Sequence, residues 1–320
     1  MVKIPPEDEI EPKQPVKIAS TLLRQAVILN KMNLRRFSPL LLLAVLTTVQ
    51  ASDTRISDVI YQKRGGFALT MDVFKPEKPN GAALIWVVSA GWNSHHQDIN
   101  PQRASVFTAR GLTVFEVVHG SQPRFKVAEI ALDIQRAVRF IRFNSARFGI
   151  DPMRIGISGA SAGGHLSLMT AAYGAQGPSD SVDPVDRESA AVEAVGVFFP
   201  PTDMLNWGKD GVAAFTLPML KIFWPAAGIT EKTSPADLTT LSHELSPIYG
   251  VTDKFPPTLL VHGDKDPLVP LQQSQLLNAK LAQLGVVHKL IVVPGGQHGW
   301  KDMAPQMLQV AEWIDEKLRK

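Results

Sequence analysis

The sequence predicts an α/β fold, with a doubly wound, mostly parallel sheet and a small cap insertion. Three observations support this fold class. Strand-like apolar runs alternate with segments of helical periodicity, several of these runs are continuously apolar, and glycine- or proline-rich turns follow the strands. Alternation of this kind is typical of a parallel sheet that helices cover on both faces.

The expected elements follow from the spacing of apolar residues. Residues 82–88 are apolar throughout, as expected of a strand that is buried on both faces. Within residues 127–148, Ile134, Val138 and Ile141 recur at intervals of four and three, which is the helical period. We expect strands near residues 57–61, 67–74, 82–88, 112–118, 154–158, 194–199, 257–262 and 288–293. We expect helices near residues 100–110, 127–148, 161–173, 271–284 and 303–319.

Two segments interrupt the alternation of strands and helices. Residues 174–191 are rich in Gly, Ser, Asp and Pro and are expected to form an excursion from the sheet. Residues 200–256 carry prolines and aromatic residues and are too long for a simple loop, so we expect a small cap there. The aromatic side chains of this segment either line an acyl or aryl pocket or form the cap's own core; they are Trp207, Phe215, Phe223 and Trp224.

A candidate nucleophile lies in the motif Gly159-x-Ser161-x-Gly163. A β-branched strand precedes the motif and a small-residue helix start follows it. This pattern predicts a nucleophile elbow, a sharp corner between strand and helix that holds the serine hydroxyl clear of the sheet. Such a corner strains the serine backbone, and a Cβ at either flanking glycine would clash with the neighbouring strand and helix. The alternative is that Ser161 only caps a small-residue helix.

The chain also supplies partners for this serine. A serine hydroxyl needs a base, normally a histidine that a carboxylate orients, and in this architecture the acid and then the histidine follow the serine in loops after strands. The strand expected at 257–262 leads into a turn with Asp264 and Asp266, of which Asp266, deeper in the loop, is favoured as the acid. The strand expected at 288–293 leads into a turn with His298, whose alternative role is that of a surface histidine.

Backbone N–H groups for a developing negative charge are expected at two places. One is Ala162, directly after the serine, and the others are Ala90 and Gly91, in the loop after the strand at 82–88. Small residues in this loop allow the backbone to approach a substrate. An ordinary small-residue turn is the alternative.

These residues resemble the α/β-hydrolase superfamily. More narrowly, the chain is similar to secreted esterases and lipases, including feruloyl- and acetyl-xylan-esterase-like and hormone-sensitive-lipase-like members. The resemblance covers roughly residues 66–319, and its most specific parts are the elbow and the His-Gly-Asp-x-Asp loop. The segments that carry it are residues 69–76, 91–92, 133–142, 148–152, 159–166, 262–266 and 297–299.

The resemblance implies a role for each triad candidate. Ser161 matches the nucleophile, Asp266 the acid and His298 the base, and no cofactor is implied. Relatives often carry His-Gly-Gly-Gly-Trp where this chain has Val-Ser-Ala-Gly-Trp at residues 88–92, a change that keeps the backbone N–H groups. Relatives also often have a Tyr-Arg pair and a proline after the next strand, and residues 119–123 keep only the proline.

Composition excludes several classes of site. With no cysteine, the chain has no disulfides, no thiolate chemistry and no cysteine-ligated zinc. No segment matches a phosphate-binding or dinucleotide-binding glycine loop. His95, His96 and Asp98 are spaced like a metal cluster, but neighbouring histidines point apart in an extended chain, so a solvated loop is favoured and no metal site is predicted.

The N-terminal region has the three parts of a secretory signal peptide. Met32 opens a stretch with the pair Arg35 and Arg36, an apolar run of about 11 residues follows, and a small-x-small cleavage site ends at Ala51. The apolar run is shorter than the roughly 18 residues that span a bilayer. We therefore expect a secreted or periplasmic protein whose mature chain begins near Ser52.

This assignment divides the chain into three parts. Residues 1–31 are expected to be a non-biological or disordered extension, residues 32–51 the signal peptide, and residues 52–320 one hydrolase domain with its cap at about 200–256. Residues 1–51 hold seven Lys and Arg and four Asp and Glu; subtracting these from totals of 33 and 30 leaves 26 of each sign. The sequence pI of about 9.0 therefore does not indicate a nucleic-acid partner.

The sequence thus predicts a secreted serine hydrolase that cleaves carboxylic esters through an acyl-enzyme. The expected substrate is a small-molecule or carbohydrate-linked ester, with Trp92, Trp207 and Trp224 as candidate binding side chains. Two alternatives are a serine peptidase related to prolyl oligopeptidases and a non-catalytic binding protein on the same fold, which the altered loop at 88–92 motivates. No stable membrane span and no particular oligomeric state are predicted.

Overall fold

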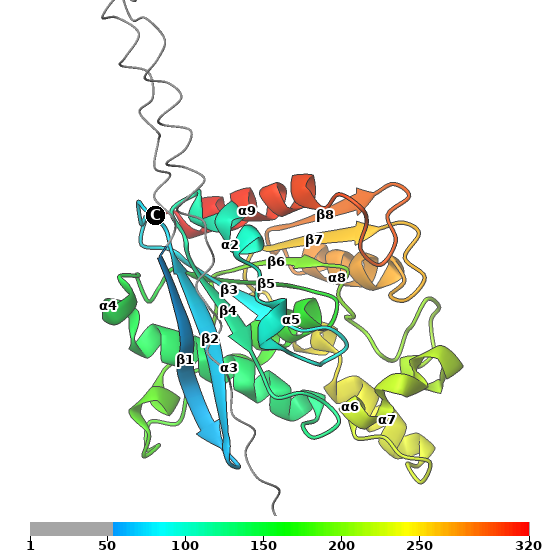
Figure 1. The fold of residues 1–320 in the computed structure, drawn as a ribbon. Helices are drawn as coiled ribbons and strands as arrows, with labels where there is room; N and C mark the ends of the chain where they lie inside the picture. The colour runs from blue at the N-terminus through cyan, green and yellow to red at the C-terminus, as the bar shows by residue number, and fades with distance from the viewer. Residues whose placement is uncertain (1–53, 320) are drawn as a thin grey trace, which may run out of the picture. The chain divides into compact units, whose positions relative to one another are not determined.

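A computed structural model describes residues 54–319 of the chain (Figure 1). The predicted extension at 1–31 and the predicted signal peptide at 32–51 lie outside the described residues. The strands are β1 Thr54–Arg64, β2 Phe67–Lys75, β3 Ala83–Val88, β4 Thr113–Val118, β5 Ile155–Ala160, β6 Ala194–Phe198, β7 Thr258–Gly263 and β8 His288–Val293. The α-helices are α2 Pro101–Thr108, α3 Val127–Phe143, α4 Ser145–Phe148, α5 Ala162–Tyr173, α6 Trp224–Ala227, α7 Pro235–Glu244, α8 Gln272–Gln283 and α9 Ala304–Leu318.

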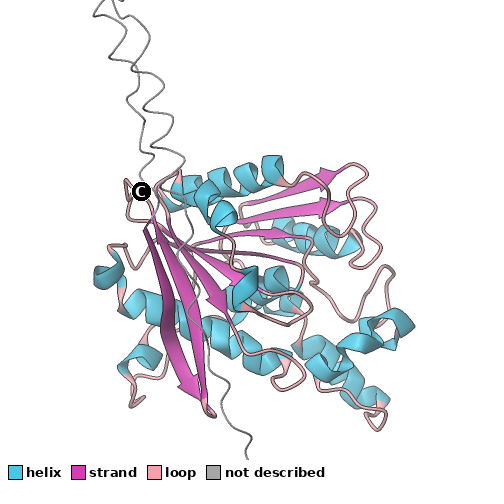
Figure 2. Cartoon of the chain, viewed as in Figure 1, coloured by secondary structure: helices cyan, strands magenta, loops and turns pink. Residues whose placement is uncertain are grey.

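The eight strands form one sheet in the order β1-β2-β4-β3-β5-β6-β7-β8. The first two strands form an antiparallel pair, β2 is also antiparallel to β4, and all pairings from β4 to β8 are parallel. Helices lie on both faces of this sheet (Figure 2). The predicted fold class is therefore confirmed, and the carboxyl ends of the parallel strands share one edge, where ligands bind in such folds.

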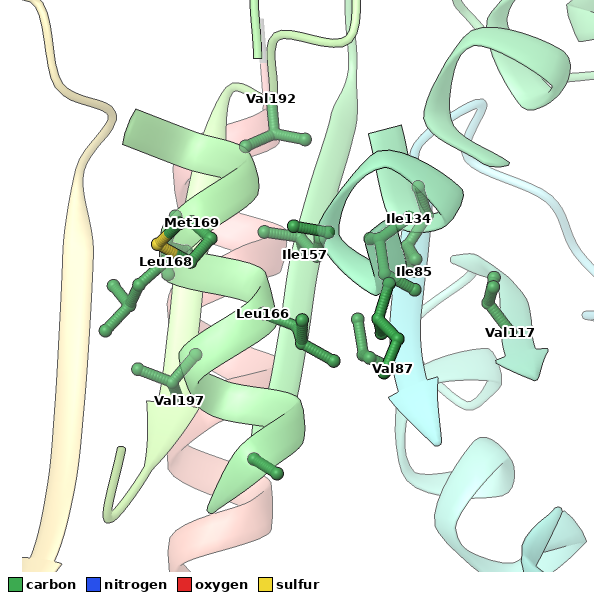
Figure 3. Packing of buried hydrophobic residues seen from close by; sticks show 14 of the residues in the cluster. Ile85, Val87, Val117, Ile134, Ile157, Leu166, Leu168, Met169, Val192 and Val197 are labelled. Atoms are coloured by element: carbon green, nitrogen blue, oxygen red, sulfur yellow. The ribbon is translucent and has the colours of Figure 1, made fainter. Parts of the chain in front are cut away.

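The core forms on both faces because successive side chains of a strand point to opposite sides. In β3, Ile85 and Val87 belong to the larger apolar cluster, with α3, α5 and α8. Figure 3 shows these two side chains beside Ile134 of α3 and Leu166 of α5. Trp86 faces the other way and packs with α2 and α9. Every residue of β3 is buried, which explains why its sequence is continuously apolar.

Two predicted elements differ from the observed bounds by more than two residues at an end, and the others lie within two residues. The helix expected over 127–148 breaks at Asn144, whose side-chain amide donates to the carbonyl of Phe140 at 2.8 Å, so that α3 and the short α4 replace one helix. The strand expected at 57–61 is part of the longer β1, which spans 11 residues. Because β1 is an edge strand with mostly exposed side chains, apolar spacing does not mark its ends.

The segment at about 200–256 lies between β6 and β7 and contains no strand in the described chain. Besides α6 and α7 it holds the short 3₁₀ helices η5 Ala214–Thr216, η6 Pro218–Phe223 and η7 Pro247–Gly250. Its start is fixed to α8, because the Gln273 side-chain oxygen accepts the N–H groups of Thr202 and Asp203 at 2.9 and 2.8 Å.

Two further 3₁₀ helices complete the described structure, η3 His96–Asp98 and η4 Pro184–Arg187. The latter lies in the predicted excursion at 174–191, where an isolated bridge also joins Gln176 to Ser189. Among the described helices, none combines the length and apolar character required to cross a membrane.

Candidate active site

Ser161 lies at the corner between β5 and α5, in a backbone conformation that few residues adopt. Its φ is 53° and its ψ is −119°. Such a conformation costs a non-glycine residue about 1–3 kcal/mol and is held by the surrounding structure. A Cβ on Gly159 would come within 2.5 Å of the carbonyl carbon of Gly163, and one on Gly163 would come within 2.5 Å of the Val87 oxygen. The two glycines therefore allow the contact of β5, α5 and β3 that creates the corner.

The structure brings Ser161, His298 and Asp266 into one hydrogen-bonded chain. The His298 Nε2 lies 2.8 Å from the Ser161 Oγ, and its Nδ1 lies 2.7 Å from the Asp266 Oδ2. Because an ionised carboxylate only accepts hydrogen bonds, Nδ1 carries the proton and Nε2 is free to accept the serine hydroxyl. The three residues follow β5, β7 and β8, so the parallel sheet gathers them at one edge.

Asp266 is held as an anion by several donors. Its side chain is fully buried, and its Oδ1 accepts the N–H groups of Leu268 and Val269, each at 2.9 Å. Burial by itself raises the pKa of Asp266, but hydrogen bonds from His262 and His298 outweigh burial and hold this pKa well below its ordinary value. A permanently charged carboxylate at this position stabilises a positive charge on His298.

The competing aspartate, Asp264, has a structural partner instead. Its Oδ1 accepts the N–H of Gly295 at 2.7 Å, which ties the loop after β7 to the loop after β8. Of the two aspartates in this turn, the structure thus pairs Asp266 with His298 and uses Asp264 to brace the turn.

Two residues that sequence reasoning missed support the chain of three. His262 Nε2 lies 2.8 Å from the Val269 oxygen and 3.4 Å from Asp266 Oδ2, while its Nδ1 lies 2.7 Å from Ser274 Oγ. Phe199, at a φ of 36°, places its ring centroid 4.7 Å from that of His298. The sequence could have indicated these two residues by their position at the carboxyl ends of β7 and β6, where the other site residues lie. Their contacts with Asp266 and His298 depend on backbone geometry that the sequence does not show.

The loop after β3 corrects one predicted oxyanion donor. Ala90 donates its N–H to the Asn93 oxygen at 2.8 Å and accepts the Asn93 N–H at 3.0 Å, so its N–H is not available to a substrate. The central residues of this tight turn, Gly91 and Trp92, have φ values of 55° and 60°. Gly91 borders the same cavity as Ser161 and Ala162, which leaves the N–H groups of Gly91 and Ala162 as the candidate donors.

A narrow, apolar cavity of about 30 Å³ adjoins Ser161. The cavity is small, so it has room for a short apolar chain. Apart from Ser161, the residues that border it are apolar or glycine. Those from the cap include Met204, Trp207, Phe215, Leu220 and Phe223.

The three predicted substrate-binding tryptophans have different positions. Trp92 and Trp207 both border the cavity. Trp224 is absent from its wall: its Nε1 donates to the Phe215 oxygen at 2.9 Å, and Lys221 Nζ lies 4.7 Å from its ring centroid. The prediction for Trp224 is therefore corrected, because its indole serves the internal packing of the cap.

One group of potential metal ligands contains none of the residues of this site. Among the described residues, Asp58, Asp72 and His96 have ligand atoms within 4.8 Å of one another. The buried Asp72 already accepts the Arg55 Nε at 2.6 Å and the Asp58 N–H at 3.0 Å, and His96 Nε2 lies 2.8 Å from Thr70 Oγ1. Because Arg55 already neutralises the buried carboxylate, we assign no metal to this group.

Comparison with known proteins finds similar esterases. The family model described as BD-FAE matches residues 71–281, a range that includes Ser161 and Asp266 and ends before His298. Esterase LipQ of Mycobacterium tuberculosis is 28% identical over 240 residues, which are 72% of this chain and 53% of LipQ. The chain thus spans about half the length of this relative. Ethyl acetate hydrolase of Pseudomonas putida is 26% identical over 273 residues, which are 82% of this chain and 80% of that enzyme.

A solved structure shares the fold. A truncated form of a carbohydrate esterase from gut microbiota superposes with a TM-score of 0.70 at 26% identity. The match covers 84% of this chain and 98% of that chain.

Proposed function

This chain belongs to the BD-FAE family, and we propose that it hydrolyses carboxylic esters through an acyl-enzyme on Ser161. The observation that carries the proposal is the chain of hydrogen bonds from Asp266 through His298 to the Ser161 hydroxyl, next to an apolar cavity. A neutral serine becomes nucleophilic when a base within hydrogen-bond reach accepts its proton.

The proposed reaction has two halves. Ser161 Oγ attacks the acyl carbon and gives its proton to His298 Nε2, and Asp266 stabilises the resulting imidazolium. The N–H groups of Gly91 and Ala162 donate to the oxyanion of the tetrahedral intermediate. His298 then protonates the leaving alcohol. Water attacks the acyl-enzyme through the same groups, releases the acid and restores the serine.

The cavity supports a short acyl group as the substrate. Its size suits an acetyl or propionyl chain, and its apolar border offers no polar partner to a charged or hydroxylated acyl group. Relatives with related chemistry are ethyl acetate hydrolase and the gut carbohydrate esterase. We therefore propose a small-molecule or carbohydrate-linked ester of a short carboxylic acid, with no cofactor required.

A panel of p-nitrophenyl esters from acetate to octanoate tests the proposal, with Ser161→Ala as the inactive control. The expected result is turnover that is highest for acetate or propionate and absent in the variant. Hydrolysis of a matched anilide as fast as the ester would favour the peptidase alternative. No turnover of any ester, with no reaction of Ser161 with a fluorophosphonate, would favour the non-catalytic alternative.

We also propose that residues 32–51 direct export of the protein. The basic pair, the short apolar run and the cleavage site at Ala51 support this proposal. N-terminal sequencing of protein recovered outside the cytoplasm should begin near Ser52, whereas a mature end upstream of Met32 would contradict it.

A further inference from the structure

The turn that presents the Gly91 N–H contains a tryptophan in an unfavourable conformation. Trp92 has a φ of 60°, a region that bulky side chains rarely occupy. Trp92 is nevertheless buried, with 5% of the residue exposed, so neighbouring groups surround it on nearly all sides. The structure must therefore supply contacts that hold Trp92, and with it Gly91, in this turn.

The polar contact of the indole is a buried histidine on the nucleophile helix. Trp92 Nε1 donates to His165 Nδ1 at 3.2 Å, and the two rings are nearly perpendicular, at 89° with centroids 5.5 Å apart. The backbone N–H of His165 donates to the Ser161 oxygen at 2.8 Å. One side chain thus joins the helix that carries Ser161 to the turn that carries Gly91.

The other ring nitrogen of His165 contacts the cap. His165 Nε2 lies 2.8 Å from the backbone oxygen of Leu245, the residue directly after α7. An indole N–H can only donate and a carbonyl can only accept, so Nδ1 is unprotonated and Nε2 carries the proton. Burial, partly offset by the Leu245 bond, lowers the pKa of His165 to about 4, which favours this neutral form.

We propose that His165 is a positioning residue that, through Trp92, holds the turn with the Gly91 N–H against the developing oxyanion. This inference rests on the proposed esterase function. His165 does not touch the reacting atoms, and it acts by fixing the distance between the elbow and the turn. Gln122 also bonds the turn, through its N–H to the Trp92 oxygen at 3.1 Å and its side-chain amide to the Gly91 oxygen at 3.3 Å. Loss of His165 is therefore expected to loosen the turn without abolishing it.

Two amide substitutions separate the two bonds of His165. The side-chain amide of asparagine lies near the position of Nδ1, so His165→Asn keeps an acceptor for Trp92 and loses the Leu245 bond. The amide of glutamine lies near Nε2, so His165→Gln keeps the Leu245 bond and leaves the indole without an acceptor. Trp92→Phe removes the donor while His165 stays in place. Trp313→Phe is the matched control, because the Trp313 Nε1 has no hydrogen-bond partner among residues 54–319.

The test is steady-state hydrolysis of p-nitrophenyl acetate by the four single variants and by the double variant His165→Gln/Trp92→Phe, with thermal unfolding as a check on folding. His165→Gln and Trp92→Phe should each lower kcat by about 10- to 100-fold with little change in KM, because a slightly misplaced donor acts mainly on the transition state. The double variant His165→Gln/Trp92→Phe should lose no more kcat than the less active of these two single variants, because both changes break the same bond. His165→Asn should retain kcat about tenfold better than His165→Gln, and Trp313→Phe should match the wild type.

Equal losses in His165→Asn and His165→Gln would overturn the proposal, as would kcat in Trp92→Phe within about threefold of the wild type. Hydrogen exchange of the Trp92 indole N–H, measured by NMR, tests the bond without any substrate. The indole N–H should exchange slowly in the wild type and in His165→Asn and rapidly in His165→Gln. Rapid exchange in the wild type would also overturn the proposal. If the wild type hydrolyses no ester while the protection pattern is as expected, the proposed function fails and the bond stands.

Discussion

Replacing Asp266 with asparagine should remove most of the activity and leave the fold in place. The carboxylate is fully buried and lies 2.7 Å from His298 Nδ1. Asparagine has nearly the same shape and keeps an oxygen for the N–H groups of Leu268 and Val269. It lacks the charge that stabilises the imidazolium, and it no longer selects the tautomer in which Nε2 accepts the serine proton.

The size of the loss follows from this geometry. The charge centres of the two groups are about 4 Å apart, which at an effective dielectric constant of about 20 gives about 4 kcal/mol. A barrier higher by that amount lowers kcat roughly 10³-fold. Because the positive charge on His298 develops only in the transition state, KM should change little.

The neighbouring aspartate provides a matched control. Asp264→Asn removes a carboxylate from the same turn, but that carboxylate accepts from Gly295 rather than from His298. Its kcat for p-nitrophenyl acetate should stay within roughly threefold of the wild type. Activity of Asp266→Asn within about tenfold of the wild type, or a larger loss in Asp264→Asn, would refute the reasoning.

Three further predictions concern the cavity, a buried histidine and the elbow. Leu220→Ala should enlarge the cavity and raise the ratio of kcat/KM for butyrate esters over acetate esters about tenfold, because each of the two extra methylenes of butyrate contributes about 0.8 kcal/mol when buried. An unchanged ratio would argue against an acyl pocket there. Burial, partly offset by a hydrogen bond with the Gly120 carbonyl, lowers the pKa of His119 to about 4, which is below its value in the unfolded chain. As the pH falls from about 6.5 to 4, the unfolded chain therefore binds a proton before the folded protein does, and the free energy of unfolding of the wild type decreases. In urea unfolding, the free energy of unfolding should fall between pH 7 and pH 4.5 by about 2–3 kcal/mol less in His119→Gln than in the wild type. Equal decreases in the two proteins would contradict this origin. Gly163→Ala places a Cβ within 2.5 Å of the Val87 oxygen and should yield little folded protein, so a stable, active variant would show that the elbow can relax.

Patterns that repeat along the chain predicted most of the fold. The continuously apolar run at 82–88 corresponds to β3, and the alternation of such runs with helical segments predicted the parallel sheet. The resemblance to α/β-hydrolase esterases, inferred from the elbow and the acid loop, is confirmed by the family match. Exposed elements were harder to delimit: β1 lacks an apolar pattern, and the break at Asn144 depends on one side-chain hydrogen bond.

Details of the site depended on geometry that spacing does not encode. The chain order of Ser161, Asp266 and His298 was sufficient to place them on neighbouring loops. The role of Ala90 was predicted incorrectly because a two-bond turn engages its N–H, a closure that residue types alone do not reveal. The role of Trp224 was predicted incorrectly because residue type does not distinguish an aromatic side chain that lines a cavity from one that packs within the cap.

Reaction with a fluorophosphonate, followed by mass mapping of the modified peptide, tests the central claim most directly. Such a probe reacts with a serine only when a base and an oxyanion site activate it. We expect one adduct, on Ser161, with ester hydrolysis lost in proportion to its formation and no adduct in Ser161→Ala. An adduct on another residue, or full activity in a protein modified at Ser161, would contradict the assignment of the site.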